Sequence, residues 1–238
     1  MKAFAATHVG KVRPINEDAY YLPEDGECFA AVADGMGGHQ AGEVASAIAI
    51  REFTAEIRGK ALNEDALKDA VRRANAAIYE EGARDPLKRG MGTTLTALWY
   101  DEDTVYLTHV GDSRAYLLRN RALMQLSNDH SLVSELVALG EITPEQALTH
   151  PQRNFITRAL GTGKKTEADI LHLDFQPGDA WLLCSDGLTN HLRTAEIAEV
   201  LLQSIPWPDK LKALIDTALL RGGRDNITAV AVLKEAAV

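Results

Sequence analysis

The feature that most constrains this chain is a short apolar run at residues 29–33 that leads directly into Asp34 and Gly35. A short apolar run bounded by glycine is typical of a buried strand, so Asp34 is expected where that strand meets a loop. The glycines that follow let the backbone approach a ligand closely, and His39 comes five residues after Asp34. A carboxylate, bare carbonyls and a histidine suit a hard metal ion and a proton-transfer group, although an Asp-Gly hairpin turn explains the stretch equally well.

Length and charge exclude several other classes of protein. The chain has 238 residues and a formal net charge of -9, which disfavours broad electrostatic binding to nucleic acid or to an anionic membrane. No apolar run approaches membrane-spanning length. Cys28 and Cys184 lie in apolar, strand-like runs, so we expect buried, reduced thiols, which fits a cytoplasmic protein, with a disulfide between them as the alternative. We also expect a monomer.

The order of the expected elements indicates an α+β fold. Strands come first, followed by two helices, more strands, two further helices and one last strand, which is not the alternation of a parallel, doubly wound sheet. A mainly antiparallel sandwich flanked by helices fits this order, in a single domain over residues 1–238. Residues 131–165 lack clear periodicity over most of their length, and we interpret them as a flap outside the sheets. The expected strands are 2–9, 19–22, 28–33, 93–99, 105–110, 115–118, 122–126, 170–173, 180–184 and 227–233; the expected helices are 40–58, one capped by Asn63, 129–140, one starting at 143–145, 194–203 and 208–221.

Five aspartates recur next to these strands. Asp34, Asp112 and Asp186 each follow an apolar run and border a glycine, Asp225 precedes the last strand, and Asp18 lies in the loop before an early strand. Carboxylates gathered at one edge of a sandwich would repel one another unless divalent cations neutralise them. Oxygen ligands without a Cys or His cluster favour magnesium or manganese over zinc. Each Asp-Gly pair taken alone is explained by a turn, but the repeated placement favours a metal centre.

Eight short motifs, taken in order, resemble one known family. Each motif alone is short, whereas eight in the right order, from residue 13 to residue 228, are specific. The chain resembles the PP2C (PPM) family of metal-dependent serine/threonine protein phosphatases, in its compact bacterial form. The motifs are Arg13-x-x-Asn16-Glu17-Asp18, Asp34-Gly-Met-Gly-Gly-His39, Met91-Gly-Thr-Thr94, Gly111-Asp-Ser-Arg114, Asp129-His-Ser131, Ile156-Thr-Arg-Ala-Leu-Gly161, Ser185-Asp-Gly-Leu188 and Gly223-x-Asp225-Asn-Ile-Thr228.

The resemblance implies a four-layer α-β-β-α sandwich with two Mn²⁺ or Mg²⁺ ions in a cleft at one edge. By the same resemblance, Asp34 bridges both ions and the Gly35 carbonyl binds one of them. Asp186 and Asp225 hold the other ion, and Asp18 assists through water. A hydroxide bridging the ions would attack the phosphorus of phosphoserine or phosphothreonine in line, without a phosphoenzyme.

Three further roles are expected. Arg13 would clamp the substrate phosphate, because a guanidinium matches phosphate oxygens in a bidentate fork. His39 would protonate the leaving serine or threonine oxygen, unless it only hydrogen-bonds a metal-bound water. Asp112 would bind a third, weaker metal together with Asp186, as in bacterial relatives, unless it only stabilises its turn. His130 is the least certain of the remaining histidines, which we interpret as structural or surface residues.

The expected partners are phosphorylated proteins, in particular a bacterial Ser/Thr kinase whose action the enzyme reverses, and the targets of that kinase. A non-catalytic phosphopeptide-binding module is the alternative from another class of function. The complete set of metal-binding positions argues against that alternative, and an assay for turnover separates the two.

Overall fold

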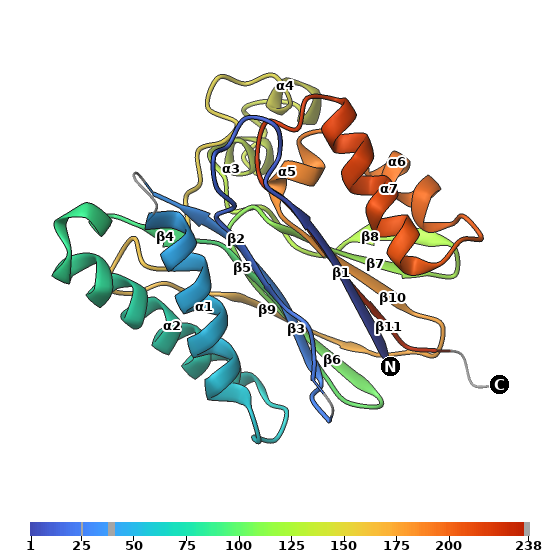
Figure 1. Cartoon of the computed structure of the whole chain (residues 1–238), viewed down its shortest axis with the longest axis horizontal. Helices are drawn as coiled ribbons and strands as arrows, with labels where there is room; N and C mark the ends of the chain where they lie inside the picture. The colour runs from blue at the N-terminus through green and yellow to red at the C-terminus, as the bar shows by residue number, and fades with distance from the viewer. Residues whose placement is uncertain (25, 38–40, 236–238) are drawn as a thin grey trace.

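The computed structural model describes residues 1–24, 26–37 and 41–235, and it consists of two antiparallel β-sheets packed face to face between helices (Figure 1). The first sheet has the strand order β1-β11-β10-β7-β8, and the second has the order β2-β3-β5-β6-β9 with β4 paired to β3. The strands are β1 (Lys2–His8), β2 (Asp18–Tyr21), β3 (Phe29–Met36), β4 (Gly92–Thr93), β5 (Leu95–Tyr100), β6 (Thr104–Val110), β7 (Arg114–Arg119), β8 (Ala122–Gln125), β9 (Asp169–Asp174), β10 (Ala180–Cys184) and β11 (Ile227–Leu233).

Two pairs of helices cover the outer faces of the sandwich. The pair α1 and α2 packs on the second sheet, and the pair α6 and α7 packs on the first (Figure 1). The helices are α1 (Ala41–Ile57), α2 (Glu64–Arg84), the 3₁₀ turn η1 (Pro86–Lys88), α3 (Leu132–Ala138), α4 (Pro144–Ala147), α5 (Asp186–Thr189), α6 (Thr194–Leu201) and α7 (Trp207–Leu220).

Alternation along the strands produces three apolar layers. In β3, Ala31 and Ala33 pack toward α1 and α2, whereas Ala30 and Val32 pack between the two sheets. In β11 the same alternation sends residues 229 and 231 toward α6 and α7, and residues 230 and 232 between the sheets. Because these strands are buried on both faces, apolar residues predominate on both of their sides and their sequences show no regular polar alternation. The expected four-layer α-β-β-α fold is confirmed.

Strand β3 is longer than the sequence predicted. We expected it to end at residue 33, but β4 pairs with Gly35 and Met36 and extends the ladder past Asp34. Asp34 therefore lies inside a strand. Asp18, expected in a loop, is the first residue of β2 and pairs with Asp34 across the ladder.

The elements after β8 also differ from expectation. Helix α3 begins at Leu132 instead of residue 129, because Ser131 caps it by accepting a hydrogen bond from the Ser134 amide at 3.3 Å. Helix α4 starts as predicted, with a capping box at Thr143. The four-residue helix α5 was not predicted.

Segment 131–165, the predicted flap, contains α3 and α4, which lie together at one end of the sandwich (Figure 1). Its two ends are joined, because the Leu132 amide donates to the Phe155 carbonyl at 2.9 Å and Ser131 bridges to Ile156. The segment is therefore anchored at its base.

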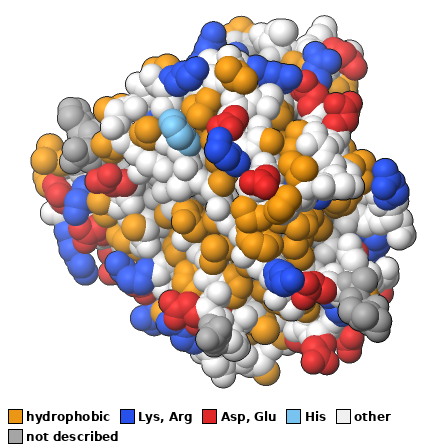
Figure 2. Space-filling model, turned by 45° about the vertical axis from the view of Figure 1, so that its right-hand side comes forward, with side chains coloured by type: hydrophobic (Ala, Val, Ile, Leu, Met, Phe, Trp, Pro, Cys, Tyr) orange, Lys and Arg blue, Asp and Glu red, His pale blue; other side chains and the backbone are white. Residues whose placement is uncertain are grey.

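The surface carries charges of both signs. On the face in Figure 2, hydrophobic side chains gather near the centre, and Lys and Arg are interspersed with Asp and Glu toward the rim. No helix in the described ranges is long and apolar enough to cross a membrane.

Candidate active site

The site is built around Asp34, whose backbone is fixed by the next motif along the chain. Its amide donates to the Thr94 hydroxyl at 2.9 Å, and its carbonyl accepts from the Thr94 amide at 2.9 Å. Thr93 also donates its hydroxyl to the Asp34 carbonyl at 2.8 Å. These bonds set the direction in which the Asp34 side chain leaves the strand.

Asp18 faces this position from the neighbouring strand. Its Oδ2 accepts a hydrogen bond from the Ser185 hydroxyl at 2.8 Å, and Ser185 in turn accepts from the Thr228 amide at 3.0 Å. Asp18 Oδ1 is buried and has no hydrogen-bond partner among the described residues. A buried, unpartnered carboxylate oxygen is costly, so this atom indicates a ligand position for a cation or for water.

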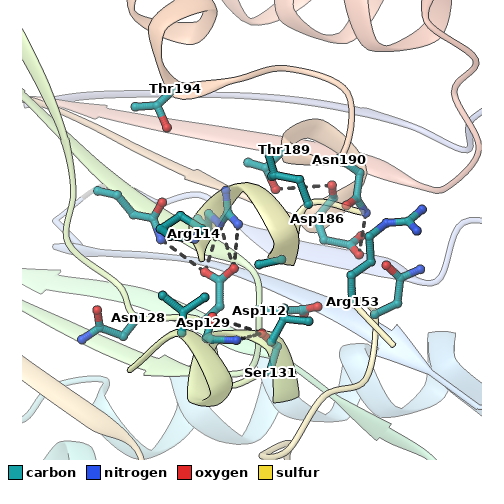
Figure 3. Close-up of a pocket in the computed structure, with 18 of the residues that line it drawn as sticks. Asp112, Arg114, Asn128, Asp129, Ser131, Arg153, Asp186, Thr189, Asn190 and Thr194 are labelled. Carbon is teal, nitrogen blue, oxygen red and sulfur yellow. Dashed lines mark hydrogen bonds and ion pairs between the residues drawn. The ribbon is translucent and has the colours of Figure 1, made fainter. Parts of the chain in front are cut away.

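Asp186 and Asp225 come from the other sheet. Asp186 follows β10 as the first residue of α5, and Asn190 donates its amide to Asp186 Oδ2 at 2.9 Å (Figure 3). Asp225 lies just before β11, next to Asn226, whose side chain accepts from the Glu17 amide and donates to two carbonyls of the 9–15 segment, all at 2.8 Å. Asn226 thereby ties the loop that carries Arg13 to the start of β11.

Gly35 and Gly42 are required by close backbone packing. A Cβ at Gly35 would lie 2.1 Å from the Gly42 carbonyl oxygen, and a Cβ at Gly42 would lie 2.5 Å from Glu17 Oε1. The Gly35 amide donates to the Glu17 carbonyl at 3.2 Å. Only glycine at both positions lets α1 approach β3 this closely.

Arg13 reaches the carboxylates from the loop after β1. Its Nη2 donates to Asp225 Oδ2 at 2.8 Å, and its Nη1 lies 3.7 Å from Glu17 Oε2. The side chain remains 45% exposed, so its outer edge is open to a ligand from solvent. Its position beside Asp225 agrees with the expected role in binding phosphate, which stays a prediction.

Asp112 occupies the turn between β6 and β7 and is buried. Nearby, Arg114 holds Asp129 through its Nε at 2.9 and 3.0 Å and through its Nη2 at 2.7 Å (Figure 3). This bidentate pair is internally neutral, so it leaves the charge of Asp112 uncompensated.

Asp112 and Asp186 line a cavity of about 870 Å³ together with residues of the helices α3 and α4. Segment 131–165 therefore forms part of the cavity wall, and Ser131 lies near Asp112 (Figure 3). The lining residues are Asp112, Arg114, Gln125, Asn128, Asp129, Ser131, Val133, Ser134, Glu135, Val137, Ala138, Pro144, Ala147, Leu148, Arg153, Asn154, Asp186, Thr189, Asn190, Leu192, Arg193 and Thr194.

Electrostatics show that the five carboxylates share one site. Burial, followed by the charges of the other four aspartates, raises the pKa of Asp34 well above its usual range. Burial raises the pKa of Asp18 to about 7, and burial with the charge of Asp186 raises the pKa of Asp112 to about 8. The pKa of Asp186 also rises, through burial and the charge of Asp225. Because like charges oppose each other's ionisation, these groups bind either protons or cations.

The donor set fits hard divalent cations. All the candidate ligands are oxygens, Asp18 Oδ1 lacks a partner, and Asp34 with Asp186 retains partial access to solvent. Within the described ranges, no three Asp, Glu, His or Cys side chains close around a single point. Carboxylates that repel one another are expected to remain apart until a cation draws them together, so this open arrangement is compatible with the fit.

His39 lies outside the described residues, as does Gly38, so the structure does not test its predicted role. Four supporting residues were missed as functional by the sequence reasoning, namely Thr94, Ser185, Asn190 and Asn226. Three of them, Thr94, Ser185 and Asn226, stand inside the family motifs, and Ser185 and Asn226 are adjacent to a recognised aspartate, which is the signal that could have found them. Asn190 lies four residues after Asp186, and the unpredicted helix α5 is what brings its side chain back to that carboxylate.

Comparison with known proteins identifies the family of this chain. The family model of protein phosphatase 2C matches residues 8–225. The serine/threonine phosphatase stp of Listeria monocytogenes is 41% identical over 246 residues, which cover 99% of this chain and 96% of that protein. The crystal structure of the Mycobacterium tuberculosis phosphatase PstP superposes with a TM-score of 0.90 at 41% identity, covering 98% of this chain and 99% of that one. A structure of the PstP catalytic domain in complex with two manganese ions matches with a TM-score of 0.87 at 40% identity, covering 97% and 96%.

A four-layer sandwich with a carboxylate centre at one edge defines an enzyme of the protein phosphatase class. The chain belongs to the protein phosphatase 2C family, and with it to the serine/threonine phosphatases.

Proposed function

We propose that this phosphatase hydrolyses phosphoserine and phosphothreonine in proteins at a two-cation centre built on Asp34. The observation that supports the proposal is the convergence of five aspartates from separate segments, where burial and the charges of neighbouring aspartates raise the pKa of Asp34, Asp112 and Asp186. The two manganese ions of the related PstP structure support the same metal count for this chain.

The proposed ligands follow from the geometry and the resemblance. Asp34 would contact both cations, and the Gly35 carbonyl would contact one of them. Asp186 and Asp225 would hold the second, and Asp18 would act through water. When bound, the two divalent cations would supply a water of lowered pKa as nucleophile and neutralise phosphate charge.

The remaining steps fall to this chain's own side chains. Arg13 would hold the phosphate oxygens, while Ser185 and Asn190 orient Asp18 and Asp186 through the bonds described above. The water oxygen forms a bond to phosphorus as the bond from phosphorus to the serine or threonine oxygen breaks in line. The products are inorganic phosphate and the free hydroxyl, and no phosphoenzyme forms.

His39 would supply the proton that the leaving alkoxide needs. His39→Ala should therefore slow hydrolysis of a phosphoserine peptide far more than that of an aryl phosphate, whose oxide leaves unprotonated. Equal losses on both substrates would remove His39 from the acid role.

The cavity beside the centre supports a protein substrate. It has a volume of about 870 Å³ and is lined by Asp112, Asp186 and residues of α3 and α4. This volume leaves space for peptide on one side of the phosphoresidue. We infer that the substrates are the targets of a bacterial Ser/Thr kinase and the kinase itself.

The decisive experiment measures phosphate release from a phosphothreonine peptide with Mn²⁺, with and without EDTA. Turnover should disappear in EDTA and return with Mn²⁺ or Mg²⁺. Asp34→Asn should lower kcat by roughly 10²–10³-fold or more, because it removes charge shared by both cations. Asp65→Asn, an exposed carboxylate on α2, is the matched control and should retain kcat. Undiminished turnover in EDTA would contradict the mechanism, and peptide binding without turnover would favour a phosphopeptide-binding module.

A further inference from the structure

His130 binds both backbone polar groups of Gly111, the residue just before Asp112. The Gly111 amide donates to His130 Nδ1 at 3.0 Å, and the Gly111 carbonyl accepts from the His130 amide at 2.7 Å. Gly111 adopts a φ of +110°, and a Cβ there would lie 2.5 Å from Thr94 Cγ2. The backbone that aims Asp112 is therefore fixed from both sides, and His130 makes two of its contacts.

The imidazole of His130 is itself fixed by a charged pair. His130 Nε2 lies 3.1 Å from both Asp169 Oδ2 and Arg158 Nη1. Because Nδ1 accepts from the Gly111 amide, the proton of the neutral ring lies on Nε2 and is donated to Asp169, and Arg158 acts on the ring through Asp169. The other oxygen of Asp169 accepts from Arg158 Nη1 at 2.7 Å. His130 is only 7% exposed, and the ring of His109 packs at 4.9 Å between centroids.

These residues come from the base of segment 131–165 and from β9. His130 immediately precedes Ser131, the cap of α3, and its carbonyl accepts from the Thr157 amide at 2.9 Å. Arg158 lies on the return of the same segment, and Asp169 is the first residue of β9. The chain Arg158–Asp169–His130–Gly111 thus connects both ends of this segment to the turn that carries Asp112.

We propose that His130 is a positioning residue that fixes Asp112 by accepting the Gly111 amide, and that Asp169 and Arg158 fix the ring for this purpose. The proposal rests on the proposed function and on the expected role of Asp112 as a ligand of a third, weaker cation. Without the Nδ1 acceptor, the buried Gly111 amide would lose its partner and the turn would be free to change. Asp112 would then bind its cation less well, while binding of the peptide by other residues would be retained.

Three substitutions of His130 distinguish the contact made by Nδ1 from the contact made by Nε2. His130→Asn keeps an acceptor where Nδ1 stands but cannot reach Asp169. His130→Gln reaches Asp169 but places no acceptor against Gly111, and His130→Phe removes both. Leu201→Ala, a buried residue of α6 in the opposite layer, is a control for loss of stability alone.

The first measurement does not depend on activity. Hydrogen exchange of the Gly111 amide, followed by NMR in metal-free protein, should accelerate by about tenfold or more in the Gln and Phe variants. It should stay within about threefold of wild type in the Asn variant and in the Leu201 control.

The second measurement is the Mn²⁺ concentration for half-maximal turnover, which should rise by about 10–100-fold in the Gln and Phe variants with KM for peptide little changed.

Unchanged protection of Gly111 in His130→Phe, or a Mn²⁺ shift in the Leu201 control as large as in the Phe variant, would overturn the proposal. If the variants fail to fold, ¹⁵N shifts of the wild-type ring decide, because a protonated Nδ1 near neutral pH would contradict its role as acceptor. Failure of the proposed function would be visible separately, since wild-type protein would then show no Mn²⁺-dependent turnover while the exchange of Gly111 still tests His130.

Discussion

Arg13 is placed to contact the carboxylates of the site and, at the same time, a ligand from solvent. Its guanidinium spans Asp225 at 2.8 Å and Glu17 at 3.7 Å, yet nearly half of the side chain is open to solvent. The same planar group can therefore steady a metal-ligand loop on one edge and bind phosphate oxygens on the other.

We expect Arg13→Ala to raise KM for a phosphothreonine peptide by roughly 10–100-fold, the loss of one or two charge-assisted hydrogen bonds, with a smaller fall in kcat. Arg13→Lys should recover part of the loss, because an ammonium keeps the charge but not the fork. Steady-state kinetics at saturating Mn²⁺ provide the measurement. A collapse of kcat with KM unchanged would place Arg13 in the transition state instead.

Asp112 offers a sparse set of metal ligands, since among the described residues that line its cavity Asp186 is the second aspartate without an arginine partner. Few charges and many waters mean weak binding. Asp112→Asn should leave folding and the two tight cations intact, lower kcat by roughly tenfold or more, and move activity to higher Mn²⁺ concentrations. Calorimetric titration with Mn²⁺ checks this. If wild type and variant have the same number of sites and the same activity curve, Asp112 only stabilises its turn.

At the scale of elements, local sequence signals such as capping residues determine where the helices begin, whereas contacts between strands determine where the site residues lie. Helix α2 begins after Asn63, whose Oδ1 accepts from the Ala66 amide at 2.8 Å, as expected for a capping residue. By contrast, β3 continues through Asp34 by pairing with Asp18 of β2, and beyond Asp34 by pairing with β4, some sixty residues later.

Removing the α2 cap should affect stability without affecting catalysis. Asn63→Ala is expected to lower the free energy of unfolding by about 1 kcal/mol, and the melting temperature by about 2–4 °C. Asn63→Asp, which keeps an acceptor oxygen, is the matched control and should stay near wild type. Thermal unfolding and KM measured on the same samples provide the check, and a change in KM would show that α2 couples to the site.

At the scale of the whole molecule, the carboxylate centre links folding to pH and to metal. The native pKa is about 7 for Asp18 and about 8 for Asp112, both above the usual value of 3.8. In metal-free protein the native state therefore binds more protons than the unfolded chain between about pH 4 and pH 8, so stability falls as pH rises through this window. Divalent cations replace these protons and should cancel the loss.

We expect metal-free protein in EDTA to melt roughly 5 °C lower at pH 8 than at pH 5.5, with the difference shrinking in Mn²⁺. The stabilisation by Mn²⁺ should accordingly be larger at pH 8 than at pH 5.5. Calorimetry at both pH values, with and without Mn²⁺, measures it. A stabilisation by Mn²⁺ that is the same at both pH values would show that these carboxylates are already ionised without metal.

The sequence by itself determined the elements, the α+β class and the identity of the acidic residues, because helix periodicity, capping residues and apolar strands are local properties of the chain. It predicted α1 within a residue at each end, the Asn63 cap of α2 and the start of α4 at Thr143. It also brought Asp18, Asp34, Asp112, Asp186 and Asp225 into one hypothesis, since each flanks an apolar strand.

Only the tertiary structure decided how these residues meet. The pairing of Asp18 with Asp34, the extension of β3 by β4, and the bond from Ser185 to Asp18 all join segments far apart in sequence. The two bonds between His130 and Gly111 are of the same kind, and they gave a role to a histidine that no local pattern could assign. Contacts of this kind depend on strand register and on the packing of two sheets, and a period read along one segment contains no information about the segment that lies across from it.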